Sequence, residues 1–301
     1  MSRFLAPGAF WLALLRGMKK GRAPFRDTEL VILLRTGFLN AFLDESGNHD
    51  GARFFALAGF IASPKRWGQF ESAWETALAR ARPPVAAFHG VNFFRGKGPL
   101  SRSRRACLDD LLQAVADSQL FPVGAIVDLE AFKALPYGER RFISGASVGA
   151  DDYGKIPLKF AKPYFLAFHH CVAQAAKQTK DGKKANIVFG PQSEYDVQAQ
   201  RLVAAVREKL PPDARQKIGT CTFAFEDVIV RPLEAADLLA HCWFAHMQYG
   251  KQNRPDREDA LNRLMAKTGS LHRYGAKDFE TLLAPLSSGE RAQLRAEAEP
   301  G

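Results

Sequence analysis

The sequence predicts an α/β protein in which helices cover both faces of one sheet, and three observations support this fold class. Short apolar runs alternate with segments of helical periodicity along most of the chain. The first run, Gly37–Asp44, is almost continuously apolar, which is typical of a strand covered on both faces. A second run, Arg53–Ile61, follows a turn that contains Gly47 and Gly51, which indicates a hairpin at the front of the fold.

The remaining elements are predicted from local signals. Ser63 is a favoured N-cap and Pro64 a favoured first helical residue, so a helix is expected from there to Arg80. A loop is expected from Arg82 to Ser101. Periodicity predicts the others, in chain order a helix over Ser103–Ser118, a strand over Phe121–Val127, a helix over Lys159–Gln178 that truly starts at Pro163, a strand over Ala185–Phe189, a helix over Glu194–Leu210, a strand over Ile218–Phe225 and a helix over Leu233–Tyr249.

Length and composition are those of a globular protein. The chain has 301 residues, of which 47% are hydrophobic and 25% charged, and this length allows one large domain. We expect a basic and apolar extension over residues 1–35, one domain over 36–285 and a tail over 286–301 that frays. Met18, which is followed by two lysines, is an alternative start of the protein.

The net charge of +10 favours an anionic partner, and nucleic acid is the partner that we expect. Half of that excess lies in residues 1–40, which hold seven Lys and Arg against two acidic residues. The four cysteines lack CxxC spacing, which argues against a structural zinc site and favours a cytoplasmic protein. The apolar stretch Phe4–Leu15 is shorter than the roughly 20 residues that span a bilayer. No membrane span is expected, although a basic amphipathic anchor is an alternative for this stretch.

Acidic residues stand at two places where burial is costly. Asp44 and Glu45 end the first strand, and Glu234 and Asp237 lie in an apolar helix. A buried charge is unfavourable unless it is paired, and a divalent cation such as Mg²⁺ or Mn²⁺ suits carboxylate oxygens. Helical spacing puts Glu234, Asp237 and His241 on one stripe. We therefore expect Asp44 and Asp237 to lie close enough to share a cation, with a solvated stripe as the alternative.

Two further interpretations concern residues near these carboxylates. Asp44 could be the nucleophile of a phosphotransferase, but that chemistry usually needs a second Asp two residues on, where Ser46 stands. Cys242 and His246 have the spacing of a soft-metal pair. No second pair lies nearby in the sequence, so core packing explains them better.

Four segments together resemble the domain of unknown function 3800 family. They are Asp44–Gly47 (DESG), Lys162–Phe168, Ile187–Tyr195 and Pro232–Ala240 (PLEAADLLA), within a resemblance that extends from about Phe38 to about Gln248. The family is assigned to the ribonuclease H-like superfold. The resemblance therefore implies a mixed sheet with an N-terminal hairpin, and a divalent-metal-dependent nuclease or a related phosphodiester hydrolase.

The resemblance also implies roles for individual residues. Asp44 and Asp237 would be the principal catalytic residues and ligands of Mg²⁺ or Mn²⁺, with Glu45 and Glu234 in secondary positions. His89 stands where the family tends to have an acid-x-His pair, and it would contact a phosphate or carry a proton. A loop histidine that caps a turn is the alternative for this residue.

The chain departs from the family pattern at Gly190, where the family strand typically ends in an Asp. Two-metal chemistry generally needs three or four carboxylates, and Glu194, Glu234 and Asp128 are the candidates to replace the missing one. The alternative function is a catalytically degenerate ribonuclease H-like domain that binds nucleic acid or a protein partner.

A basic stretch, residues 93–105, is the candidate substrate-binding segment. It contains no acidic residue, and the neighbouring Phe93 and Phe94 suit base stacking. A solvated basic loop is the alternative. Its cations, which would contact phosphates, are Arg95, Lys97, Arg102, Arg104 and Arg105.

Overall fold

A six-stranded mixed sheet lies at the centre of the residues that the computed structural model describes, namely 38–96, 98–145, 161–191, 212–224, 228–266 and 269–297. Its strands are β1 (Leu39–Ser46), β2 (Phe54–Ala62), β3 (Phe121–Asp128), β4 (Ala185–Phe189), β5 (Ile218–Phe223) and β6 (Ser270–Tyr274). They lie in the order β5-β4-β1-β2-β3-β6. β1, β2 and β3 form an antiparallel meander, β4 and β5 continue parallel to β1, and β6 pairs parallel to β3.

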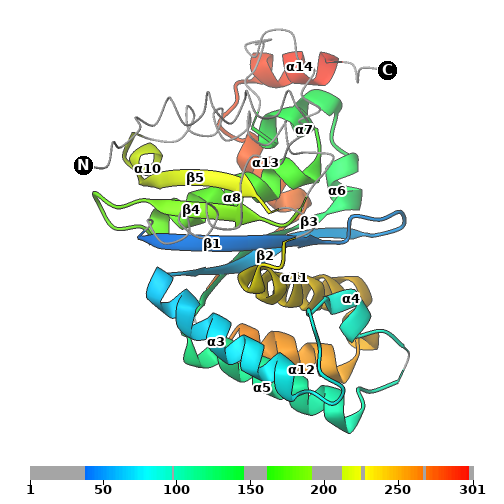
Figure 1. Cartoon of the computed structure of the whole chain (residues 1–301). Helices are drawn as coiled ribbons and strands as arrows, with labels where there is room; N and C mark the ends of the chain where they lie inside the picture. Colours follow the sequence, from blue (N-terminus) through cyan, green and yellow to red (C-terminus); the bar gives the residue numbers. More distant parts are fainter. Residues whose placement is uncertain are drawn as a thin grey trace, which may run out of the picture. The chain divides into compact units, whose positions relative to one another are not determined.

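Helices cover both faces of the sheet, which confirms the predicted layer arrangement (Figure 1). One side, the α11 face, carries α3 (Pro64–Arg80), α4 (Gly90–Phe93), α5 (Arg102–Asp117), α11 (Arg231–Tyr249) and α12 (Pro255–Leu264). The other side, the α8 face, carries α6 (Leu129–Lys133), α7 (Tyr137–Ile143), α8 (Pro163–Gln178), α10 (Pro212–Lys217), α13 (Ala276–Leu283) and α14 (Ser288–Ala296). A short 3₁₀ turn, η1 (Gly250–Gln252), follows α11.

Side chains of the sheet alternate between these two faces, as the geometry of a strand requires. In β1, Ala41 and Leu43 belong to the apolar core beneath α8, together with Phe168. Phe42, which lies between them, points to the α11 face, where its ring meets Trp67 of α3 at 4.8 Å between centroids. The two faces therefore have separate apolar layers.

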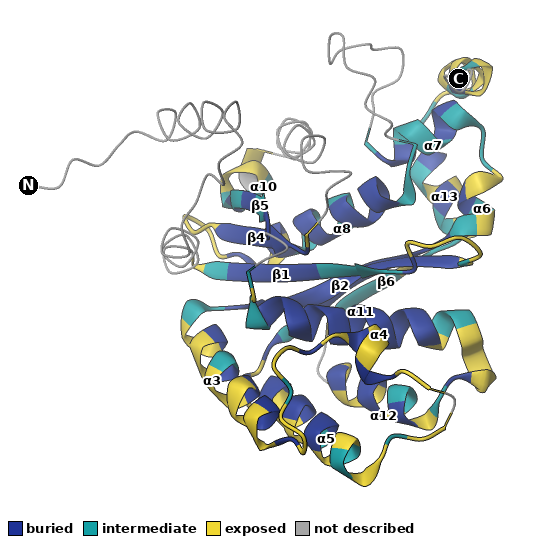
Figure 2. Ribbon diagram, turned by 45° about the vertical axis from the view of Figure 1, so that its right-hand side comes forward, coloured by how far each residue is buried: buried dark blue, intermediate teal, exposed yellow. Residues whose placement is uncertain are grey.

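The helix α11 is buried almost along its full length between the sheet and the outer helices of its face (Figure 2). Every residue from Pro232 to Ala245 is buried, which is typical of a helix that is apolar all round. Pro232 stands in its first turn, where a missing backbone N–H costs nothing. Any ionisable side chain between Pro232 and Ala245 is consequently held in a buried environment.

The strands and helices predicted from the sequence are present with bounds that differ by at most two residues, wherever the structure describes them. The extension over residues 1–35 and the helix predicted over Glu194–Leu210 lie outside the described residues. All described residues belong to one compact unit, which spans Gly37–Gly301. Among them, no helix combines the length and the apolar character that crossing a membrane requires.

The C-terminal end differs from the expectation of a frayed tail. Residues 288–296 form α14 because Ser287 and Glu290 make a capping box at its start. Its two arginines, Arg291 and Arg295, donate to the buried carboxylate of Glu139 in α7, at 2.9 and 2.7 Å. The helices α4, α6, α7 and α10 and all elements after α11 are not predicted from the sequence.

Candidate active site

Asp44 and Asp237 meet on the α11 face of the sheet. Asp44 shares the even-numbered side of β1 with Phe42, so its carboxylate points toward α11. Asp237 lies in the middle of α11 and is only 9% exposed. Burial and the nearby charge of Asp237 raise the pKa of Asp44 well above its ordinary value. The structure thus brings together the two carboxylates that the sequence analysis pairs.

Asp237 fastens the start of α4 to α11. Its Oδ2 accepts hydrogen bonds from Nδ1 of His89 at 2.9 Å and from the backbone N–H of Gly90 at 2.7 Å. A Cβ at Gly90 would lie 3.1 Å from Oδ1 of Asp237 and 2.9 Å from Cβ of His241, so glycine permits this close approach. The hydrogen bond to Asp237 raises the pKa of His89. The His89 side chain is 59% exposed, which leaves its ring accessible to a ligand.

His241 lies one turn after Asp237 and is buried with no hydrogen-bond partner at either ring nitrogen within the described residues. Its ring stacks on Phe94, with centroids 5.5 Å apart and planes inclined by 14°. Burial lowers the pKa of His241 to about 4, so the imidazole is neutral at neutral pH. Helical spacing predicts His241 on the acidic stripe, whereas its missing hydrogen-bond partner is visible only in three dimensions.

Glu234, which is predicted to be a metal ligand, is held by two side chains of the protein. Its Oε2 accepts a hydrogen bond from Nε1 of Trp74 at 2.6 Å, and its Oε1 accepts one from Arg231 at 2.8 Å. Burial raises the pKa of Glu234. Because both oxygens are engaged, we assign this carboxylate to the packing of α11 against α3.

The other acidic candidates point away from Asp44, serve as a helix cap or lie outside the described residues. Glu45 is the odd-numbered neighbour of Asp44 in β1, so it points to the α8 face, and its Oε1 accepts a hydrogen bond from Asn48 at 3.1 Å. Asp128 caps the N-terminus of α6 through its Oδ1. Glu194 lies outside the described residues. Two carboxylates therefore share the described part of the site.

Gly190 follows β4 and lies directly against Asp44. Its backbone N–H donates to the carbonyl of Leu43 at 2.8 Å. A Cβ at position 190 would lie 2.1 Å from Oδ1 of Asp44, which is too close for any real side chain. A carboxylate at position 190 would thus stand beside Asp44, whose own carboxylate would have to move to admit it.

Two cations of the basic stretch have structural partners. Arg105 forms ion pairs with Asp256 and Asp259 of α12. Arg104 donates from Nη1 to the carbonyl of Phe93 at 3.4 Å. Arg105 thus connects α5 to α12, and Arg104 ties the start of α5 to the end of α4. Of the two, Arg105 is the less available to a substrate, because it is held by two carboxylates.

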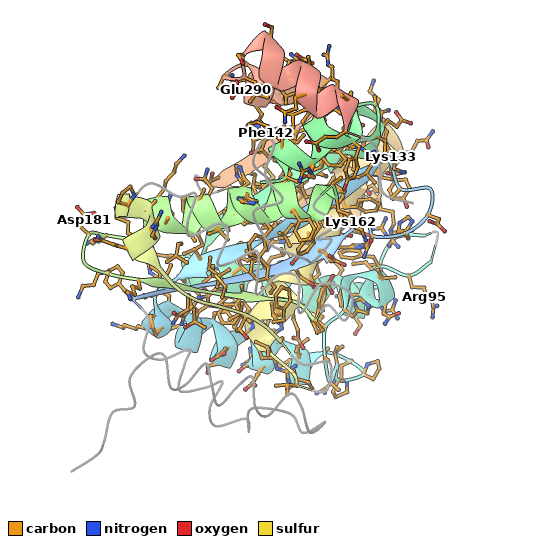
Figure 3. The ribbon with its side chains drawn as sticks, turned by 90° about the horizontal axis from the view of Figure 1, so that it is seen from above. Arg95, Lys133, Phe142, Lys162, Asp181 and Glu290 are labelled. Carbon is orange, nitrogen blue, oxygen red and sulfur yellow. The ribbon has the colours of Figure 1, made fainter. Side chains whose placement is uncertain are left out.

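The remaining cations of this stretch face solvent or are not described. Arg95 and Arg102 are exposed and have no side-chain hydrogen bond or ion pair within the described residues. Figure 3 shows Arg95 at the edge of the molecule with its side chain directed outward. Lys97 lies outside the described residues. Phe93 and Phe94 are buried, at 7% and 1% exposure, so the base stacking expected of them is not available.

Comparisons with known proteins do not assign the chain to a family. No family model, no curated protein and no solved structure matches it. Within the residues that the structure describes, no group of three or more His, Cys, Asp or Glu side chains could hold a metal ion. The molecule is therefore defined by its α/β fold and by a site with two carboxylates, an accessible histidine and a buried histidine.

Proposed function

We propose that the protein is a divalent-metal-dependent nuclease or a related phosphodiester hydrolase, with its site at Asp44 and Asp237. The observation that carries the proposal is the approach of these two carboxylates between β1 and α11, where burial and the nearby charge of Asp237 raise the pKa of the half-buried Asp44. Two like charges in such a place are unfavourable unless a proton or a cation neutralises them. A hard divalent cation suits two facing carboxylates.

The available oxygen atoms fit one such cation. Asp44 accepts a backbone hydrogen bond at Oδ1, and Asp237 accepts two at Oδ2. The second oxygen of each carboxylate accepts none within the described residues. Mg²⁺ usually keeps several waters and takes one or two carboxylates together with substrate phosphates, so two carboxylates suffice. When bound, the cation would supply positive charge to the phosphate.

His89 is the proton carrier in this proposal. Its Nδ1–H donates to Asp237, which fixes the ring and leaves Nε2 for a substrate. The raised pKa of His89 increases its protonated fraction near neutral pH. A protonated, oriented imidazole is suited to donate a proton to the oxygen that leaves when a phosphodiester bond breaks.

The arrangement of the sheet also supports the ribonuclease H-like fold that the family resemblance implies. The β1–β2 hairpin opens the described fold, the sheet is mixed, and helices lie on both faces. Asp44 stands near the end of a central strand, between β2 and β4. We include this finer fold assignment in the proposal.

A catalytically degenerate domain that binds nucleic acid or a protein partner is the second candidate. The acid count favours it, because Glu234 is engaged by Trp74 and Arg231 and position 190 has no side chain. Two-metal hydrolysis generally needs more carboxylates than the two that share the described site. Such a domain would keep the exposed Arg95 and Arg102 for binding and would not hydrolyse phosphodiester bonds.

The test is a cleavage assay beside a metal-binding measurement. The full-length protein is incubated with labelled single- and double-stranded DNA and RNA in Mg²⁺, Mn²⁺ or EDTA, and metal affinity is measured by calorimetry. We expect metal-dependent cleavage that Asp44→Asn or Asp237→Asn lowers at least roughly 100-fold, since losing even an outer partner of a metal ligand costs up to about 100-fold. Asp110→Asn, which changes an exposed carboxylate on α5, is the matched control.

The outcomes separate the two candidates. Metal binding that depends on Asp44 and Asp237 without cleavage of any substrate would favour the degenerate domain. Failure of the wild-type protein to bind either metal would contradict the cation site and the hydrolase together. Cleavage that survives both Asn variants would place the chemistry elsewhere on the molecule.

A further inference from the structure

A cavity of about 230 Å³ lies directly beside His89. Its walls come from three segments, which are residues 81–87, the helix α4 and the start of α5. The ring of His89 lines this cavity while its Nδ1 is bonded to Asp237. His89 therefore belongs both to the wall of this cavity and to the candidate active site.

Two polar side chains of the cavity are not engaged by the protein. Arg82 and Asn92 are exposed and make no side-chain hydrogen bond or ion pair within the described part of the chain. Their neighbours are committed, because Arg104 donates to the carbonyl of Phe93 and the hydroxyl of Ser103 donates to the carbonyl of Arg82. One amide and one guanidinium are therefore available to a ligand.

The size and lining of the cavity limit its occupant. It is smaller than the roughly 300–1,000 Å³ clefts that hold drug-sized ligands, so a single ring system is the best fit. Pro83, Pro84 and Val85 supply apolar walls. An amide reads the edge of a base, and flat apolar surfaces support its faces.

We propose that this cavity binds one unpaired base of a single-stranded nucleic acid, with the adjoining phosphate at His89. The proposal rests on the proposed function, and it specifies the substrate as single-stranded. A base within a duplex is paired and stacked, so it could not enter without being extruded. The exposed and unengaged Arg95 and Arg102 suit contacts with the phosphates on either side.

The experiment measures binding by fluorescence anisotropy in EDTA, which prevents cleavage. The full-length protein is titrated with labelled single-stranded DNA and RNA of about 12 nucleotides, a length within known single-strand site sizes, and with the matching duplexes. Ala87→Phe fills the cavity, and Asn92→Ala removes its amide. Ala73→Phe is the matched control, because it places the same ring in a separate groove between α3 and α5.

We expect single strands to bind at least about tenfold more tightly than duplexes, and Ala87→Phe and Asn92→Ala each to weaken single-strand binding about tenfold, the usual worth of one stacked or paired base. The control should bind like the wild type, and thermal melting should show all variants folded. Equal affinity for duplexes, or single-strand binding that neither cavity variant weakens, would overturn the proposal. Cavity-dependent binding in a protein that never cleaves would support the base site and refute the hydrolase instead.

Discussion

At the level of single residues, His241 carries a free-energy cost that its neighbours do not offset. Neither ring nitrogen has a hydrogen-bond partner within the described residues, and Phe94 offers only a stacking contact. An unsatisfied buried polar group costs about 1–3 kcal/mol. We expect His241→Phe to raise the free energy of unfolding near neutral pH by about 1–2 kcal/mol in urea denaturation. The exposed His49→Phe should change it by less than about 0.5 kcal/mol.

The same residue makes stability depend on pH. Unfolded histidine titrates near about 6.5, whereas burial lowers the pKa of His241 in the fold to about 4. Between these values the unfolded chain binds more protons, so stability falls as the pH falls from about 6.5 to about 4. The loss attributable to His241 is about 3 kcal/mol. His241→Phe should reduce the loss of unfolding free energy between about pH 6.5 and about pH 4 by that amount. An unchanged pH dependence would show that the pKa of His241 is not lowered in the fold.

Gly190 allows a test of how tightly the site is packed. A Cβ at this position would overlap Oδ1 of Asp44, so Gly190→Ala must move that carboxylate or the strand end. We expect metal affinity, measured by calorimetry, to fall about tenfold or more, with a stability loss of about 1–3 kcal/mol. Gly190→Asp should behave like Gly190→Ala and should not restore a ligand set. Stronger metal binding by the Asp variant would contradict this and would indicate that an acid at position 190 completes the ligand set.

Whether a site residue can be predicted from the sequence depends on whether its role follows from a local pattern or from a contact with a distant segment. Asp44 and Asp237 can be paired from sequence because each is marked by a local pattern, a strand end and an apolar helix stripe. Alternation along β1 also separates Asp44 from Glu45, and that signal was available in the sequence. The engagement of Glu234 by Trp74 was not predictable, because its partner comes from a distant helix.

At the level of elements, one buried carboxylate joins three segments. Glu234 of α11 accepts from Trp74 of α3 and from Arg231, which also donates to the carbonyl of Ala86. We expect Glu234→Gln to lower the free energy of unfolding by about 1–3 kcal/mol, because it weakens a buried charged hydrogen bond. Glu75→Gln removes an exposed carboxylate 3.5 Å from the same arginine and should cost less than about 1 kcal/mol.

Metal affinity distinguishes this structural role from a ligand role. Glu234→Gln should leave the calorimetric affinity for Mg²⁺ or Mn²⁺ unchanged, because the carboxylate already has two partners. A loss as large as that of Asp237→Asn would return Glu234 to the ligand set.

Among the elements that were not predicted, α14 had a visible signal, since Ser287 and Glu290 have capping-box spacing. The strand β6 had none, because Ser270–Tyr274 lies at an edge and lacks a continuous apolar run.

At the level of the whole molecule, the compact unit that begins at Gly37 should fold without the preceding residues. The first described strand pairs with β2 and β4, and both partners come later in the chain. We expect a protein that begins at Thr36 to keep its melting temperature within a few degrees. A fall of more than about 5 °C, roughly 1 kcal/mol or more, would show that the extension contributes to the core.

The order of the chain gives the candidate site a timing during synthesis. Asp44 stands near the start of the compact unit, and Asp237 follows 193 residues later (237 minus 44). At about 5–20 residues per second, a ribosome needs roughly 10–40 s to cover that distance. A nascent chain therefore carries one half of the site long before α11 can dock against β1. Any chemistry that requires both carboxylates is withheld until α11 has been synthesised and has docked against β1.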